Sequence, residues 1–276
     1  MVLDLPSDLR PFYSGRELYG ENLTDDQVNQ WLADESTAYG NLGFDDSLHG
    51  EAYPYHEANR FDFWNDLFPR MTGCRTLGFG SAHGAEFIPL LKYVGTLTIV
   101  EVDGRFHKSN SLGDHATYRF PNEKDGLIPE QDNSFDLVTC LGVLHHIPRV
   151  SVAIKDLSRV LAPGGILVLR EPTNSMGDWR IARPGLTAHE RGIPLKLLES
   201  MLKSTGFHIQ SMKPVDVGVV KELARHIIHK LPSQHPSLTR LDRRLGQLPI
   251  WDTTYRRSSL FAKLGPTSAS IIAIKL

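Results

Sequence analysis

The stretch that decides the fold runs from Arg75 to Glu101 and reads RTLGFGSAHGAEFIPLLKYVGTLTIVE. A short apolar strand enters a turn with Gly78, Gly80 and Gly84, and after a helix-like apolar pattern a second strand closes on Glu101. Glycines at such a turn permit positive φ and let the backbone approach a ligand closely, because no Cβ intervenes. An acid that ends the second strand can accept hydrogen bonds from both hydroxyls of a ribose. The stretch therefore predicts the opening half of a nucleotide-binding α/β sheet whose ligand contains an adenosine.

The glycine spacing argues against a dinucleotide. A dinucleotide fingerprint reads G-x-G-x-x-G, but its third glycine position is His83 here, and Gly84 comes one residue late. Taken alone, the turn is also compatible with a plain tight connection between a strand and a helix. A dinucleotide-dependent oxidoreductase is therefore the disfavoured interpretation.

Three later segments extend the pattern. Residues 133–138 (NSFDLV) enter an apolar strand that reaches residues 144–148 (LHHIP). A helix with one apolar face follows and is predicted to stop at residues 163–165 (PGG). The next strand, residues 166–169 (ILVL), ends at residues 170–172 (REP). The order strand, helix, strand continues the α/β pattern.

In combination and order, these motifs resemble the class I S-adenosylmethionine-dependent methyltransferases, over about residues 72–212 plus the last strand. The resemblance implies an α/β fold with a Rossmann-like, seven-stranded, mostly parallel sheet and helices on both faces. It also implies S-adenosyl-L-methionine as the cofactor and S-adenosyl-L-homocysteine as the product. The cofactor contacts that it implies are Gly78, Phe79, Gly80, Ser81, Glu101, Val102, Asp125 and Leu141.

Two positions depart from the family pattern. The family has an acid two residues before the first glycine, where this chain has Thr76, and a third glycine at the position of Ala82. Both changes fall in the region that holds the methionine end of the cofactor. For the ribose, Glu101 is preferred over Asp103 because it lies at the strand terminus, whereas Asp103 is better placed to cap the next helix.

His145 and His146 follow the predicted fourth strand, at the carboxyl edge where open α/β sheets bind ligands. Since imidazole titrates near neutral pH, either one is a candidate general base, and a structural role for both is the alternative. Neighbouring side chains on extended backbone point to opposite sides, so the pair is not expected to chelate one metal. No H-E-x-x-H, C-x-x-C or clustered acidic triad occurs, and no metal is expected.

Two further segments are expected to face the substrate. A long polar loop follows Glu171, and such loops in compact domains are usually functional or disordered. Its charged and aromatic residues, including an exposed tryptophan, argue against disorder. The leader before the glycine turn is expected to fold over the cofactor, as in related enzymes. The substrate candidates are Asp178, Trp179, Arg180, His189, Tyr55 and His56, and the alternative bases are His189, Glu190 and Asp178.

The predicted organisation has two parts. Residues 1–70 form a helical N-terminal lid, and residues 71–276 form the methyltransferase-like domain, with a helical insertion over residues 213–265. Thr24 and Gln27 have the spacing of a capping box and predict the start of a helix. The final apolar run, residues 270–274, is expected to insert as an antiparallel strand beside strand six.

The composition, with 41% hydrophobic and 22% charged residues, is ordinary for a globular protein. No apolar run approaches the roughly 18 residues that span a membrane, and the N-terminus does not read as a secretory signal. The two cysteines, Cys74 and Cys140, are expected to be small buried hydrophobes. These features predict a soluble protein of the reducing cytoplasm.

The net charge of −2 is unevenly distributed, with acidic residues 1–70 and basic residues 221–263. Such asymmetry can mark an anionic partner, or it can reflect solvated helix faces. The expected partner is a small-molecule or glycan-like acceptor that is methylated on a hydroxyl or amine, since no recognised RNA-binding module occurs. The alternatives are an RNA or polyanion methyltransferase and a non-catalytic binding protein that retains the fold.

Overall fold

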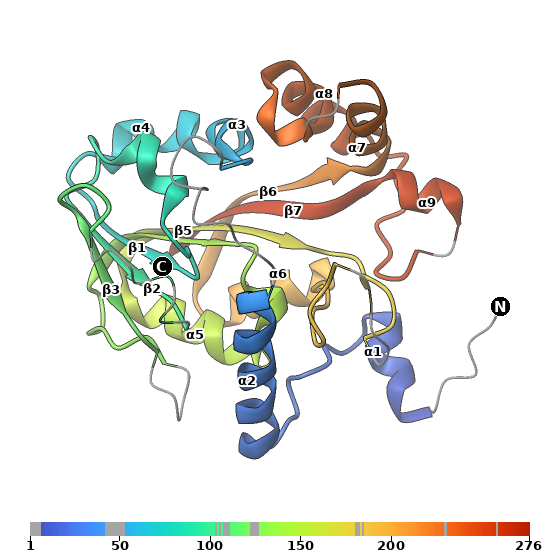
Figure 1. The fold of residues 1–276 in the computed structure, drawn as a ribbon, viewed down its shortest axis with the longest axis horizontal. Coiled ribbons are helices and arrows are strands. Elements are labelled where there is room, and N and C mark those ends of the chain that lie inside the picture. The colour runs from blue at the N-terminus through green and yellow to red at the C-terminus, as the bar shows by residue number, and fades with distance from the viewer. Residues whose placement is uncertain are drawn as a thin grey trace.

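The computed structural model describes residues 7–41, 53–102, 104, 106, 111–121, 127–179, 183, 185–228, 231–257 and 259–276. Its centre is a seven-stranded sheet in the order β3-β2-β1-β4-β5-β7-β6 (Figure 1). The strands are β1 Arg75–Phe79, β2 Thr96–Val100, β3 Ala116–Arg119, β4 Phe135–Leu141, β5 Leu161–Pro172, β6 Phe207–Val217 and β7 Pro266–Lys275.

The first five strands pair in parallel, and β7 is antiparallel to both β5 and β6. The predicted mostly parallel sheet, with an antiparallel last strand inserted beside strand six, is therefore confirmed. Parallel strands carry their carboxyl ends to one edge, so the turns after β1, β2, β4 and β5 meet there.

The helices lie on both faces of the sheet, as predicted (Figure 1). They are α1 Arg10–Ser14, α2 Asp25–Asn41, α3 His56–Asn59, α4 Asn65–Met71, α5 Val150–Val160, α6 Leu195–Ser204, α7 Gly218–Leu223, α8 Pro236–Gly246 and α9 Leu260–Leu264. Thr24 and Gln27 form the predicted capping box, because each backbone N–H donates to the other's side-chain oxygen, at 2.9 and 3.4 Å.

Two apolar cores form because successive strand residues point to opposite faces. On β5, Leu167 and Leu169 pack with α5 and α6, whereas Ile166 and Val168 pack on the other face. That second core includes Phe63, Trp64, Leu67 and Met71, from the π-helical turn Arg60–Trp64 and α4. The segment before β1 is thus part of the sheet's packing, in addition to any role as a lid.

Several predicted elements differ in extent. The helix-like pattern after the glycine turn is a 3-10 helix, Ala85–Leu90, which contains Pro89. Strand five starts at Leu161, before the PGG motif, because Leu161 pairs with Phe135 of β4. Strand six continues to Val217, so the helices before β7 begin at residue 218 rather than 213. Within the described residues, none of the helices combines the length and apolar character that crossing a bilayer requires.

Candidate active site

In the glycine turn after β1, the backbone lies very close to neighbouring side chains. Gly80 has φ +67°, and a Cβ there would lie 2.6 Å from a methyl carbon of Val143. A Cβ on Gly78 would overlap the Ser81 hydroxyl. Both positions therefore require glycine, and the turn is held against the loop that follows β4.

Ala82 stands where the family has its third glycine, and its φ is +46°. Left-handed backbone costs a residue with a Cβ roughly 1–2 kcal/mol, so this position has kept the glycine conformation without the glycine. The other departure, Thr76, is fully buried, and its hydroxyl donates to the carbonyl oxygen of Cys74 at 3.4 Å. Thr76 therefore makes its own local contact inside the sheet.

Glu101 ends β2 and is rigidly held. Its Oε2 accepts from the backbone N–H of Ala82 at 2.9 Å, and its Oε1 accepts from the N–H of Val102 at 2.9 Å. The side chain thus ties the second strand to the glycine turn. A carboxylate oxygen can accept more than one hydrogen bond, so this geometry fits a ribose diol. Asp103 and Asp125 lie outside the described residues.

Two observations indicate that this edge fits an adenosine cofactor. The backbone at Gly80 allows a close approach, and the carboxylate of Glu101 is held in place by hydrogen bonds. Phe79 and Ser81 are buried beside them, Val102 is exposed, and Leu141 ends β4 at the same edge. Nearby Glu86 is buried too, and burial raises its pKa to about 7.

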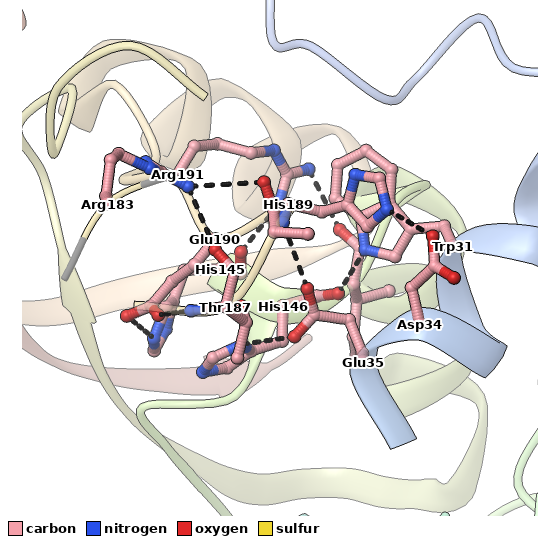
Figure 2. A network of polar contacts seen from close by, with 12 residues as sticks. Trp31, Asp34, Glu35, His145, His146, Arg183, Thr187, His189, Glu190 and Arg191 are labelled. Carbon is pink, nitrogen blue, oxygen red and sulfur yellow. Dashed lines mark hydrogen bonds and ion pairs between the residues drawn. The ribbon is translucent and has the colours of Figure 1, made fainter. Parts of the chain in front are cut away.

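The loop after β4 is organised by Glu171 at the end of β5. The Glu171 carboxylate accepts from three successive backbone N–H groups, those of Val143, Leu144 and His145, at 2.9, 2.8 and 3.3 Å. These bonds fix a 3-10 turn, Leu144–His146, where the sequence predicted extended backbone. The expectation that the two histidines point to opposite sides is therefore wrong, since their ring centroids lie 4.0 Å apart (Figure 2).

His145 is buried between two carboxylates. Its Nδ1 lies 2.8 Å from Glu171, and its Nε2 lies 3.5 Å from Glu190. Burial opposes the charged ring, but the hydrogen bonds to Glu171 and Glu190 outweigh it and raise the pKa of His145 to about 9. At neutral pH His145 is an imidazolium, which has no lone pair with which to act as a base.

His146 has the opposite protonation state. Burial and the neighbouring charge of His145 lower its pKa, in spite of the Glu35 carboxylate 2.9 Å from its Nδ1. The ligand-capable atoms of His145, His146 and Glu190 all lie within 4.8 Å of one another, an arrangement that could hold a metal ion. The expectation that the two histidines could not share one metal is therefore wrong. The proton on His145 offsets one of the two carboxylate charges beside it, those of Glu171 and Glu190.

Helix α2 and the loop over residues 187–191 close over this pair (Figure 2). The Trp31 indole donates to the carbonyl oxygen of His146 at 2.7 Å and stacks on His189, whose Nε2 lies 2.9 Å from Asp34. Arg191 is fully buried and donates to the carbonyl oxygens of His145, Ile147, Pro148 and Tyr19. The predicted lid is therefore joined to the loop by specific polar contacts.

The predicted substrate residues do not gather in one place. His189 belongs to the network under α2, whereas Trp179 is only 7% exposed and packs between Tyr13 and Tyr19, which corrects its expected exposure. Asp178, the residue before Trp179, is half-buried. Arg180 lies outside the described residues. Tyr55 and His56 begin α3, on the other side of the sheet edge.

Around Tyr55 the structure shows a cluster of aromatic and polar side chains that the sequence did not reveal. Arg170, near the end of β5, is only 7% exposed and donates to the amide oxygen of Asn59. Its guanidinium lies over the rings of Tyr55 and Phe63, at 5.1 and 5.7 Å from their centroids. Asn59 in turn donates to the Tyr53 hydroxyl at 3.3 Å.

Glu35, Glu171, Asn59 and Arg170 were all missed as site residues. For Glu171 and Arg170 a signal was present, since both lie at the carboxyl end of a predicted strand, as Glu101 does. For Glu35 and Asn59 no local signal exists, because each contact joins residues 111 positions apart.

The fold and the site together define a cofactor-binding α/β enzyme of the methyltransferase type. Over residues 54–212, more than half of its length, the chain matches the family model described as a methyltransferase domain. The chain belongs to this family, and the enzyme class indicated by the sequence motifs, S-adenosylmethionine-dependent methyltransferase, is confirmed.

Two relatives illustrate the similarity. The ubiquinone biosynthesis O-methyltransferase of Xanthomonas euvesicatoria pv. vesicatoria (strain 85-10) is 26% identical over 177 residues, 61% of this chain and 70% of that protein. The demethylmenaquinone methyltransferase of Staphylococcus aureus (strain MRSA252) is 37% identical over 127 residues, 44% of this chain. The chain spans about half of that second relative, at 52%.

Among solved structures, the [4+2]-cyclase SpnF superposes with a TM-score of 0.54 at 16% identity, over 93% of this chain and 98% of that one. At this identity the likeness shows the fold alone. Since one fold hosts several chemistries, the acceptor has to be inferred from the site.

Proposed function

We propose that the protein transfers the methyl group of S-adenosylmethionine to a hydroxyl or amine of a small molecule held at the carboxyl edge of the sheet. Gly78, Gly80 and Glu101 would hold the adenosine part of the cofactor, which supplies an already activated methyl group. The protein then has to place the acceptor, remove its proton and exclude water.

The observation that carries the proposal is the contact between the glycine turn and the histidine loop. Val143 packs against Gly80, three residues before His146, so the histidine pair lies next to the cofactor turn. Of the two histidines we assign the base role to His146, because its lowered pKa keeps a lone pair on the ring at neutral pH. Glu35 orients the ring and stabilises the imidazolium that forms when His146 takes the proton.

The enclosure of this edge favours a small acceptor over a polymer. Helix α2 closes over the histidine loop, and part of the basic stretch is already used inside the protein. Arg243 is only 11% exposed and pairs with Asp62 at 2.6 Å, and Arg257 donates to the carbonyl oxygen of Ala262. The names of the two relatives, which concern ubiquinone and demethylmenaquinone, support a hydroxylated ring compound as the first class to try.

The test is methyl transfer from isotopically labelled S-adenosylmethionine to a set of catechols and hydroquinones, followed by mass spectrometry. With the best acceptor, His146→Gln should lower kcat by about 10²–10⁴-fold at little change in KM, since only proton removal is lost. The acid limb of the wild-type kcat profile, below pH 6.5, should disappear in the variant. His208→Gln, on the exposed side of β6, is the control. Full activity of His146→Gln would refute the assignment.

A further inference from the structure

Arg170 is a buried cation whose charge is not matched by a paired carboxylate. The side chain is more than nine-tenths buried, and its Nε–H has no hydrogen-bond partner within the described residues. Its one polar side-chain contact there is the neutral amide of Asn59. A buried guanidinium costs several kcal/mol unless it is paired, so an arginine in this state needs an explanation.

Two buried acids, Glu86 and Asp216, interact with the charge of Arg170, but neither forms an ion pair with it among the described residues. Burial raises the pKa of Glu86 to about 7, so its carboxyl group is partly protonated under neutral conditions. Asp216 is ionised, because the charges of Lys221, Arg243 and Arg170 hold its pKa below the ordinary value against the effect of burial. Its charge is therefore shared among three cations, and it makes no described ion pair with Arg170.

Arg170 lies among aromatic rings at the edge of the sheet where ligands bind. The residue lies at the carboxyl end of β5, opposite Leu141 of β4, on the edge where this enzyme class binds its ligands. Tyr55 and Phe63 present their ring faces to the guanidinium, and Tyr55 is itself 37% exposed. Stacked rings hold the planar guanidinium in one orientation without consuming its N–H donors.

We propose that Arg170 anchors the carboxylate of a small molecule that binds beside Tyr53, Tyr55, Asn59 and Phe63. Nε–H and one Nη–H point the same way, and a carboxylate can accept both in a bidentate pair. Two sources share this chemistry: the α-carboxylate of the cofactor and a carboxylate on the acceptor. The inference rests on the proposed function only in taking the ligand to be a partner of the methyl transfer.

The test follows the Arg170 Nε–H resonance in arginine-labelled protein, assigned by its disappearance in Arg170→Lys. Two ligand pairs differ by a group that bears a carboxylate. S-adenosylhomocysteine has an amino acid end that methylthioadenosine lacks, and 3,4-dihydroxybenzoate, tested in the presence of methylthioadenosine, has a carboxylate that catechol lacks. If the cofactor is the source, only S-adenosylhomocysteine in the first pair shifts the resonance. If the acceptor is the source, only 3,4-dihydroxybenzoate in the second pair does so.

The affinities of the same ligands for Arg170 variants give a second test of the proposal. Arg170→Met should weaken the carboxylate-bearing member of the responding pair about 10- to 100-fold and leave its counterpart unchanged, as expected for a charge-assisted hydrogen bond. Arg170→Lys serves if the methionine variant does not fold, and Arg240→Met is the control, because Arg240 is exposed and lies over Phe61. An unshifted resonance with both pairs would overturn the inference. Methylthioadenosine binding, followed on backbone amides, tests the cofactor site separately.

Discussion

The imidazolium of His145 should make the stability of this protein depend on pH in a defined window. The ring lies between Glu171 and Glu190, and its pKa is raised from 6.5 to about 9. Because the pKa is higher in the folded state, the stabilisation is complete below pH 6.5 and is lost as the pH rises through about 9. A pKa difference of about 2.5 units, at ~1.4 kcal/mol each, corresponds to about 3.5 kcal/mol of unfolding free energy.

The variant to compare is His145→Asn, whose amide can still donate to Glu171 but cannot carry a charge. Urea unfolding followed by tryptophan fluorescence, at intervals from about pH 6 to about pH 10, gives the free energy for both proteins. The stability advantage of the wild-type protein over the variant should be about 3.5 kcal/mol larger at the acid end of this range than at the alkaline end. Groups remote from His145 cancel in the difference, whereas His146 contributes at the acid end, because the charge of His145 lowers its pKa. Parallel pH profiles would refute the charged state of His145.

Two further substitutions test the packing around the site. Gly80→Ala should lower the melting temperature more than Gly164→Ala and weaken cofactor binding, because both glycines have positive φ but only Gly80 would overlap Val143; equal effects would contradict the close approach. Asp62→Ala should cost about 3–5 kcal/mol of unfolding free energy by breaking a buried ion pair, whereas Asp25→Ala at an exposed pair should stay within about 0.5 kcal/mol in the same denaturation assay. A small loss for Asp62→Ala would contradict the buried network.

The sheet and the cofactor edge could be predicted from sequence because their signals are local. Each strand is a short apolar run next to its own turn residues, and Glu101 follows its strand directly. The same logic would have found Arg170 and Glu171, which were treated only as the end of a strand. Local pattern predicted the strands and their order, whereas the segments after β1 and β4 contain 3-10 turns that it did not predict.

The features that could not be predicted depend on contacts between segments that are distant in the sequence. The 3-10 turn that brings His145 and His146 together exists because Glu171, 26 positions from His145, accepts three of the loop's N–H groups. Trp179 looks exposed in a polar loop, but Tyr13 and Tyr19 from the N-terminal segment cover it. No property of either local stretch encodes these partners, so spacing and periodicity could not predict them.

Calorimetric titration with S-adenosylhomocysteine tests the central claim most directly. The account predicts micromolar binding by the wild-type protein. Glu101→Gln should bind at least about 10-fold more weakly, because the hydrogen bonds from the ribose to a charged acceptor are lost, at about 1.5–3 kcal/mol each. Absence of binding by the wild-type protein, or equal affinity in the variant, would contradict the placement of the cofactor against Gly80 and Glu101.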